Sequence, residues 1–192
     1  MSDYPPIGRR IVVLGTTGSG KTTLAEQLSE KLGCTHIEMD ALHWEPNWVE
    51  AATEVFHERV RQAVAAERWV MDGNYGVVRD TAWSRADTVI WLDYALPVVL
   101  WRLLRRTLRR VLLREELWNG NHERFATQFL TRDSLFLWAL KTYWLRRREY
   151  PELLGRPEYA HLKLIRLRSP RETERWLANL LEPTSLLSEP QT

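Results

Sequence analysis

Short runs rich in apolar residues recur along the chain, and most of them stop at a glycine or an aspartate. The runs are too short for helices, and continuous apolar stretches of this length are typical of strands that are buried on both faces of a parallel sheet. They predict strands at residues 11–14, 35–39, 69–71, 88–92 and 162–167.

The segments between these runs carry apolar residues at helical spacing. Leu24, Leu28 and Leu32 follow one another at four-residue intervals, and Gly33 is a typical helix end. Ser169 before Pro170 is a typical helix start, with serine as the cap and proline in the first turn. The spacing predicts further helices at 49–66, 98–114 and 132–149.

Strands that alternate with helices predict an α/β fold with a parallel sheet and right-handed crossovers. We therefore expect a five-stranded parallel sheet flanked by helices, with a long helical excursion before the last strand. A length of 192 residues fits one domain, which we place at 9–181. Flexible tails are expected at 1–8, where two prolines resist regular structure, and at 182–192, which is rich in proline, serine and threonine.

A glycine-rich segment follows the first predicted strand and matches the pattern G-x-x-x-x-G-K-[ST]. The pattern is typical of a loop whose backbone N–H groups and helix N-terminus surround phosphate groups. A glycine-rich turn without a ligand is the alternative, but here an apolar strand precedes and a periodic helix follows. The residues of this loop are Gly15, Thr16, Thr17, Gly18, Ser19, Gly20, Lys21, Thr22 and Thr23.

Two side chains of the loop have separate expected roles. Lys21 is expected to reach the β- and γ-phosphates of a nucleoside triphosphate, and so to act in catalysis. Thr22 is expected to offer its hydroxyl to Mg²⁺, which accepts few protein ligands. The loop therefore predicts ATP and Mg²⁺ as cofactors.

Three aspartates, Asp40, Asp72 and Asp93, each follow a predicted strand. The carboxyl ends of parallel strands line the same crevice as the phosphate loop. A carboxylate at this edge can hold Mg²⁺ or accept the proton of a substrate hydroxyl. The alternative is an aspartate that caps a helix or a turn.

Arginines form one stripe along the helix predicted at 98–114, because they recur at intervals of three and four residues. Such dense positive charge repels itself unless a partner compensates it, and arginines over a transferring phosphoryl group stabilise the transition state. A solvated basic face and a surface for nucleic acid or anionic lipid are the alternatives. The stripe comprises Arg102, Arg105, Arg106, Arg109 and Arg110.

The motifs together resemble the adenylate-kinase-like P-loop proteins described as DNA topology modulation (FlaR-like) proteins, over about residues 9–181. The resemblance implies a P-loop NTPase fold of the nucleotide-kinase type with a helical lid insertion at about 112–145. The segments that carry it, besides the phosphate loop and the arginine stripe, are Asp40-Ala41-Leu42-His43-Trp44, Trp69-Val70-Met71-Asp72-Gly73-Asn74-Tyr75 and Trp91-Leu92-Asp93.

The resemblance also implies roles for single residues. Asp72 takes the place of the Walker B acid at the end of the strand beside the first, and so belongs with Thr22 at the metal. Asp40 stands where shikimate and gluconate kinases place the acid that orients the acceptor hydroxyl. By position, Arg102 and Arg106 are the catalytic arginines that precede the lid.

The residues expected to bind the acceptor match the related kinases less closely. The related kinases carry D-G-F-P-R after the Walker B strand, whereas this chain reads D-G-N-Y-G-V-V-R, so that Arg79 is the nearest replacement for the usual substrate arginine. His43 and Trp44 lie in a loop with Pro46 and Asn47, where a ring of the substrate could stack. A loop packed by its own aromatic side chains is the alternative.

Composition narrows the class of partner. The net charge of +2, from 27 basic and 25 acidic residues, disfavours a nucleic-acid partner without excluding one. The single cysteine, Cys34, excludes an intrachain disulfide and a cysteine-based zinc site, and fits a reducing, cytoplasmic setting. No apolar run reaches 18 residues and no signal peptide is recognisable, so that no membrane association is expected.

These observations predict a kinase that binds Mg·ATP and transfers the γ-phosphoryl group to a nucleotide, a nucleoside or another small hydroxyl compound. Its partners would be a nucleoside triphosphate and a small-molecule acceptor, and the chain would act as a monomer or a homodimer. A nucleic-acid-associated ATPase and a nucleotide-binding regulator are the alternative functions.

Overall fold

The structure is a computed structural model that describes residues 4–113, 118–121 and 135–180. The predicted tail at 182–192 lies outside the described residues, as do 114–117 and 122–134 of the predicted lid. Residues 4–8, which were expected in a tail, contact the domain: the Tyr4 hydroxyl donates to Glu172, and the backbone N–H of Gly8 donates to Thr88 Oγ1 over 3.0 Å.

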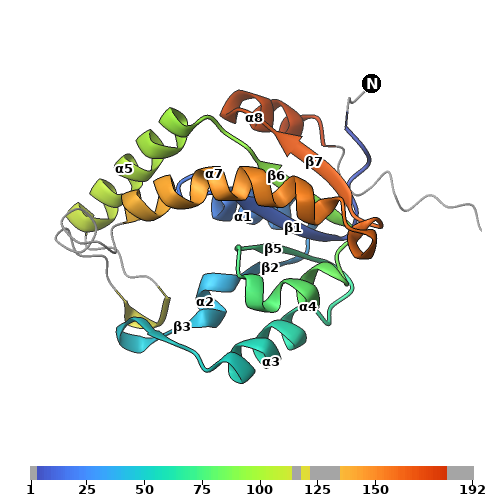
Figure 1. Ribbon diagram of the computed structural model, residues 1–192, viewed down its shortest axis with the longest axis horizontal. Coiled ribbons are helices and arrows are strands. Elements are labelled where there is room, and N and C mark those ends of the chain that lie inside the picture. The colour runs from blue at the N-terminus through green and yellow to red at the C-terminus, as the bar shows by residue number, and fades with distance from the viewer. Residues whose placement is uncertain (1–3, 114–117, 122–134, 181–192) are drawn as a thin grey trace, which may run out of the picture.

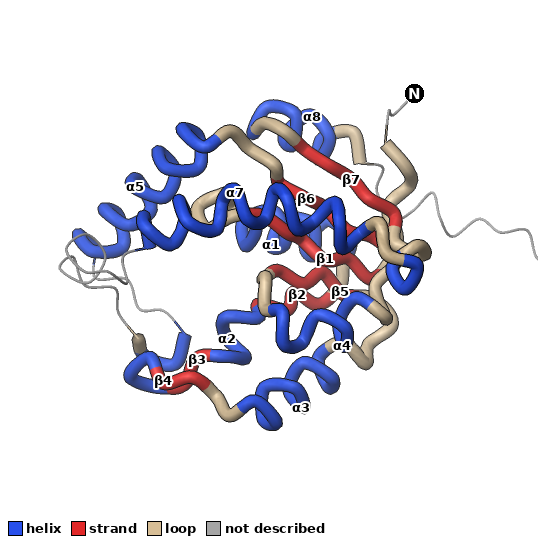
Figure 2. Tube along the Cα trace, in the orientation of Figure 1, coloured by secondary structure: helices blue, strands red, loops and turns tan. Residues whose placement is uncertain are grey.

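Five parallel strands form the central sheet in the order β2-β5-β1-β6-β7, which confirms the predicted sheet (Figures 1 and 2). Strand β5 pairs with β1, so that the strand ending at Asp72 lies beside the strand that leads into the phosphate loop. The strands are β1 (Arg10–Gly15), β2 (Thr35–Glu38), β5 (Trp69–Asp72), β6 (Thr88–Leu92) and β7 (Lys163–Leu167).

Helices cover both faces of the sheet, and the side chains of β1 alternate between two cores. Ile11 and Val13 pack with residues of α1, α5 and α8, whereas Val12 and Leu14 pack with residues of α3, α4 and the end of α7. The longer helices are α1 (Lys21–Leu32), α3 (Thr53–Ala63), α5 (Leu96–Leu113), α7 (Leu135–Leu154) and α8 (Pro170–Ala178), and α4 (Arg79–Trp83) is short.

The helix predicted at 49–66 was placed wrongly at its start. Helix α3 begins only at Thr53, because the preceding residues form a hairpin of β3 (Trp44–Glu45), a 3₁₀ turn η1 (Pro46–Trp48) and β4 (Val49–Glu50). Asn47 in this turn has a φ of 64°, a left-handed conformation that breaks a helix. Val49, whose apolar side chain suggested a helix, is exposed in β4.

The second strand ends one residue earlier than predicted, at Glu38. Met39 begins a short helix, α2 (Met39–His43), so that Asp40 lies in its first turn. The predicted end of α1 at Gly33 and the predicted start of α8 are confirmed: Gly33 has a φ of 59°, and Ser169 Oγ accepts a hydrogen bond of 3.2 Å from the Glu172 N–H.

The segment after the arginine helix is described only in part. It contains a 3₁₀ turn, η3 (Trp118–Gly120), and α7, which runs past Pro151 to Leu154 and so five residues beyond the predicted end. Two further 3₁₀ turns, η2 (Gly76–Val78) and η4 (Pro157–Tyr159), lie elsewhere in the domain. Within the described residues, no helix has the length and apolar character that crossing a membrane requires.

Candidate active site

The phosphate loop joins the carboxyl end of β1 to α1, and its tight path depends on glycine. Gly18 and Gly20 have φ angles of 86° and 94°, which other residues adopt only with strain. The Ser19 side chain is fully buried, and its Oγ makes no hydrogen bond to any described residue. A buried hydroxyl with spare hydrogen-bonding capacity inside such a loop fits a phosphate ligand.

Helix α5 lies directly over this loop. A Cβ atom at Gly18 would stand 2.9 Å from both the Leu103 Cβ and the Val99 carbonyl oxygen, and a Cβ atom at Gly20 would stand 2.8 Å from Arg102 Nη2. The Arg102 guanidinium therefore reaches the N-terminus of α1, and it also lies 5.7 Å from the centre of the Tyr94 ring. Three arginines of the stripe, Arg102, Arg106 and Arg110, are partly buried, whereas Arg105 and Arg109 are exposed.

Charged groups from four elements gather around Lys21. The pKa of its ammonium group is lowered from 10.5 to about 8, chiefly by burial and also by the positive charges of Arg146 and Arg106. The carboxylates of Asp72 and Asp40 act in the opposite direction. The structure thus brings four of the predicted site residues together: Lys21, Arg106, Asp40 and Asp72.

Asp72 is buried at the end of β5 and holds two partners. The Thr22 hydroxyl donates to Asp72 Oδ1 over 2.9 Å, and His36 Nε2 lies 2.8 Å from Asp72 Oδ2. A hydroxyl and a carboxylate are the hard oxygen ligands that Mg²⁺ prefers, so this pair fits a magnesium ion held between the loop and β5. Thr23, the last residue of the loop, is exposed on α1.

His36 did not emerge from the sequence. It lies inside β2, away from every motif, and it meets Asp72 only because β2 pairs with β5. Its hydrogen bond to Asp72 raises the pKa of the His36 imidazole.

Asp40 lies in the first turn of α2 and accepts a hydrogen bond of 2.5 Å from the Tyr75 hydroxyl at Oδ1. Burial, with a contribution from the Asp40 charge, raises the pKa of Tyr75 far above its usual value, so that this hydroxyl stays protonated as a donor. A second carboxyl lies nearby: burial raises the pKa of Glu38, against a hydrogen bond from Trp118 and with the charges of Asp72 and Asp40 adding to the rise.

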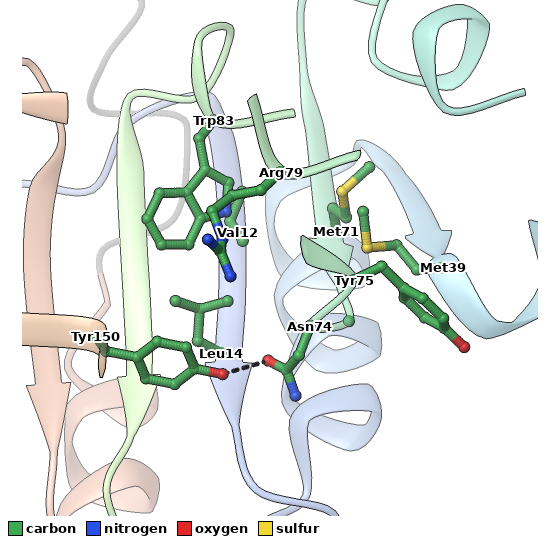
Figure 3. A pocket seen from close by; sticks show the side chains of 10 residues that line it. Val12, Leu14, Met39, Met71, Asn74, Tyr75, Arg79, Trp83 and Tyr150 are labelled. Carbon is green, nitrogen blue, oxygen red and sulfur yellow. Dashed lines mark hydrogen bonds between the residues drawn. The ribbon is translucent and has the colours of Figure 1, made fainter. Parts of the chain in front are cut away.

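Two further residues, Asn74 and Arg146, reach the phosphate loop and were missed. Asn74 Nδ2 donates to the Gly15 carbonyl oxygen over 2.7 Å, and Arg146 Nη1 donates to the same oxygen over 3.3 Å. Tyr150, one turn along α7 from Arg146, donates to Asn74 Oδ1 over 2.9 Å, as Figure 3 shows. Asn74 follows Asp72 and Gly73 directly, and Arg146 stands in a run of three arginines, so neither was singled out as a site residue. The four-residue spacing of Arg146 and Tyr150 is the only signal that placed them on one face.

Arg79, the predicted substrate arginine, lies at the start of α4. Its Nη2 donates to Glu149 Oε1 over 3.1 Å, and its guanidinium lies 5.6 Å from the centre of the Trp83 ring. Together with Asn74 and Tyr75 it lines a small pocket (Figure 3). The arginine expected for the substrate is therefore held by an acid.

The hairpin after α2 carries the predicted aromatic residues. The His43 ring packs against Trp44 and Tyr75, with centroid distances of 4.9 and 4.6 Å, and Trp48 lies 5.5 Å from Trp44. Trp118 of η3 completes the row at 6.3 Å from Trp48. These rings pack on one another, as the alternative interpretation of the loop proposed, but Trp44 and Trp48 keep part of their surface accessible.

Asparagines of the segment around η3 fasten it to this hairpin. Asn119 Nδ2 donates to the Trp44 carbonyl oxygen over 2.5 Å. The buried Asn121 donates to the Glu45 carbonyl oxygen over 3.0 Å and accepts from the Trp48 N–H over 2.9 Å. Residues 118–121, after the arginine helix, thus contact the hairpin, and no sequence motif predicted this contact.

Asp93 does not join the other two aspartates. It is buried, and it forms ion pairs with Arg147 Nε at 2.8 Å and with Arg166 Nη2 at 2.5 Å. Arg147 also donates to Tyr143, and Arg166 lies 4.4 Å from the centre of the Trp91 ring. This cluster ties α7 to the ends of β6 and β7 and so fixes the helix that carries Arg146.

Comparison with known proteins places this arrangement among kinases. Residues 11–123 match the model of a family described as an AAA domain. A shikimate kinase of Synechococcus elongatus is 31% identical over 147 residues, an alignment that covers 62% of this chain and 74% of that protein.

Solved structures share the fold at lower sequence identity. A gluconokinase of Sinorhizobium meliloti superposes with a TM-score of 0.51 at 20% identity, over 96% of this chain and 100% of that one. A shikimate kinase of Bacteroides thetaiotaomicron gives a TM-score of 0.51 at 16% identity, over 93% and 98%. These likenesses support the P-loop kinase fold.

Proposed function

The chain belongs to the family described as an AAA domain and is a P-loop protein homologous to small-molecule kinases, and from this premise we propose that it transfers the γ-phosphoryl group of Mg·ATP to the hydroxyl of a small molecule. One observation carries the proposal. Lys21, the bonded pair of Thr22 and Asp72, and Asp40 all meet at the mouth of one phosphate loop.

In the proposed reaction, the acceptor oxygen forms a bond to the γ-phosphorus while the bond from that phosphorus to the β,γ-bridging oxygen breaks. The hydroxyl proton passes to the Asp40 carboxylate, which Tyr75 orients through its hydrogen bond. Lys21, Arg102 and Arg106 stabilise the negative charge on the transferring group. Thr22 and Asp72 would hold Mg²⁺, which would supply positive charge against the phosphate groups.

The proposal has finer parts. We place the chain in the adenylate-kinase-like, FlaR-like group on its strand-end motifs, with a lid at about 112–145 that closes over the site and excludes water. We further propose a cytoplasmic enzyme that acts as a monomer or a homodimer. The contacts of η3 with the hairpin support a lid that reaches the acceptor side.

A second candidate function is a nucleic-acid-associated ATPase. It is favoured by the exposure of Arg105 and Arg109, which leaves part of the arginine stripe facing solvent. It is disfavoured by Arg102, which turns to the phosphate loop instead.

The test is ADP release in the presence of Mg·ATP and a panel of hydroxyl compounds, compared between Lys21→Ala and Lys31→Ala. Both lysines lie on α1, but only Lys21 is near the phosphate loop. Lys21→Ala is expected to lower turnover by about 10²–10³-fold, the usual cost of removing one charge-stabilising donor. A large loss of melting temperature with unchanged ATP affinity in Lys21→Ala would contradict the proposal.

A further inference from the structure

The charges of the candidate active site are divided between two sides. Arg102 and Arg146 lie against the phosphate loop, one near Gly20 and the other on the Gly15 carbonyl oxygen. Around α2 and the hairpin several carboxylates gather instead. These acids are Glu38, Asp40 and Glu50.

The basic side chains on this second side are engaged by carboxylates. Arg59 Nη2 lies 2.7 Å from Glu45 Oε1, and Arg79 Nη2 lies 3.1 Å from Glu149 Oε1. His43 Nε2 lies 3.9 Å from Glu50 Oε1. An anionic substrate on this side would have to displace one of these carboxylates from its partner, and it would also face like charge.

This side offers aromatic surface instead, built from rings that meet edge to face. The rings of His43, Trp44 and Tyr75 form a packed group beside Asp40, and Trp48 and Trp118 extend it. The pocket in Figure 3 is lined by Met39, which precedes Asp40 in the chain, and by Tyr75, which donates to Asp40. Arg79 is the single charged residue among the 10 that line it. Aromatic and apolar surface of this kind binds rings by stacking and by burial.

Resting on the proposed function, we infer that the phosphoryl acceptor is an uncharged hydroxyl compound with a flat ring, the class to which nucleosides belong. Such a compound would place its ring on the aromatic side and its hydroxyl at Asp40. Shikimate and gluconate, after which the related kinases are named, carry a carboxylate that this side would repel.

The first experiment compares acceptor classes by ADP release. The panel contains adenosine, guanosine, cytidine and thymidine, the matching nucleoside monophosphates, shikimate and gluconate. The best nucleoside is expected to exceed every carboxylate and monophosphate in kcat/KM by roughly tenfold or more, because like charges in the site penalise an anion. A carboxylate or a monophosphate as the best acceptor overturns the inference and leaves the proposed function standing.

Binding without ATP separates the inference from the proposed function. Calorimetry with the same nucleosides is expected to show binding that weakens about tenfold or more in Trp44→Leu and returns in Trp44→Phe, since base–aromatic stacking contributes strongly to affinity. Trp101→Leu, which removes an exposed tryptophan of α5, is the matched control. Nucleoside binding without ADP release would overturn only the proposed function, whereas the absence of nucleoside binding overturns the inference.

The third experiment changes the charges of the acceptor side. Glu149→Gln releases Arg79 from its ion pair, and Glu38→Gln removes an acid beside Asp40. Each is expected to raise kcat/KM for gluconate or shikimate, relative to the best nucleoside, by roughly fivefold or more. Glu67→Gln is the control, because Glu67 is exposed two residues before β5, at the opposite end of the sheet. An unchanged ratio in both variants overturns the electrostatic basis of the inference.

Discussion

The phosphate loop and the hairpin of β3 and β4 lie on opposite sides of Asp40 and handle charge in opposite ways. Among the described residues, the two arginines that reach the loop, Arg102 and Arg146, form no ion pair, and their charge is directed at the loop. On the hairpin side, Arg59 and Arg79 each pair with a glutamate. The difference suggests that one side binds an anion and the other selects a substrate by shape.

The largest effect is expected on the loop side. Arg102→Ala should lower turnover by at least ~10³-fold, the lower range for an arginine that stabilises phosphoryl transfer. Affinity for ATP should change much less, because the contact matters most as charge develops in the transition state. Steady-state kinetics measure both quantities, and Arg105→Ala, on the exposed part of the same helix, is the control.

The same variants test the nucleic-acid alternative. If the stripe binds DNA, Arg102→Ala and Arg105→Ala should weaken duplex binding almost equally, and each should reduce the slope of log affinity against log salt by about one. Unchanged turnover in Arg102→Ala together with such salt-dependent duplex binding would contradict the role of this helix in catalysis.

The second largest effect on turnover is expected at Asp40, which lies between the two sides. Asp40→Asn removes the proton acceptor and is expected to lower kcat by about 10²–10⁴-fold, the usual contribution of general base catalysis. Tyr75→Phe, which removes only the hydrogen bond to Asp40, should lower kcat less. Equal losses in the two variants would mean that Asp40 acts through its hydrogen bond with the Tyr75 hydroxyl and takes no proton.

Asp72 should separate metal binding from acceptor chemistry. Asp72→Asn is expected to raise the Mg²⁺ concentration for half-maximal activity by about 10–100-fold, because the carboxylate orients the Thr22 hydroxyl toward the metal. Asp40→Asn should leave this concentration unchanged. Metal titrations at saturating ATP make the comparison, and identical curves for the two variants would remove the division of roles.

Local sequence predicted the loop side well. The nine loop residues are consecutive, and the apolar run before them predicts the strand that ends there. Asn74 and Arg146 were missed because they reach Gly15 from positions 59 and 131 residues away along the chain. A contact of that kind depends on strand order and on the packing of α7, and neither is encoded in a short motif.

The hairpin side was the harder one to predict. The aromatic residues after Asp40 were recognised and placed in a loop, but the last strand of the hairpin, β4, was mistaken for the start of a helix, because Val49 fits a helical period. Nothing in the sequence reveals the left-handed φ of Asn47. The pairing of Arg79 with Glu149 was equally hidden, since the two residues are 70 positions apart. The charge and shape of this side depend on burial and on ion pairs between residues that are far apart in the sequence.

On the loop side, the pKa of Lys21 should make kcat/KM for ATP depend on pH, an effect smaller than those of the substitutions above. Burial lowers this pKa to about 8, so the phosphate-binding charge is lost as the pH rises through about 8. Above that pH, kcat/KM for ATP should fall about tenfold per pH unit. In the unfolded chain the lysine keeps its proton up to 10.5, so the unfolded state binds more protons between these values and stability rises with pH there.

Above about pH 8 the titration of Lys21 lowers kcat/KM but raises stability, and this opposite direction distinguishes loss of ATP binding from unfolding. Melting temperatures across the same pH range should not fall on account of Lys21. Lys21→Arg, whose guanidinium stays charged, should show no such drop in kcat/KM, even if its maximum is lower. A drop that persists in Lys21→Arg would assign the titration to another group.

The smallest effect is expected at the contact between η3 and the hairpin, and it should appear on the acceptor side alone. Asn121→Ala removes the hydrogen bonds to the Trp48 N–H and the Glu45 carbonyl oxygen, and one neutral hydrogen bond contributes about 1 kcal/mol, or roughly fivefold. KM for the best acceptor of the panel should therefore rise roughly fivefold, while KM for ATP stays constant, because no bond of Asn121 reaches the phosphate loop. Asn179→Ala, exposed after α8, is the control. If both KM values rise together in Asn121→Ala, the two sides are coupled through the segment around η3, and the division between an anion-binding side and a shape-selecting side no longer holds.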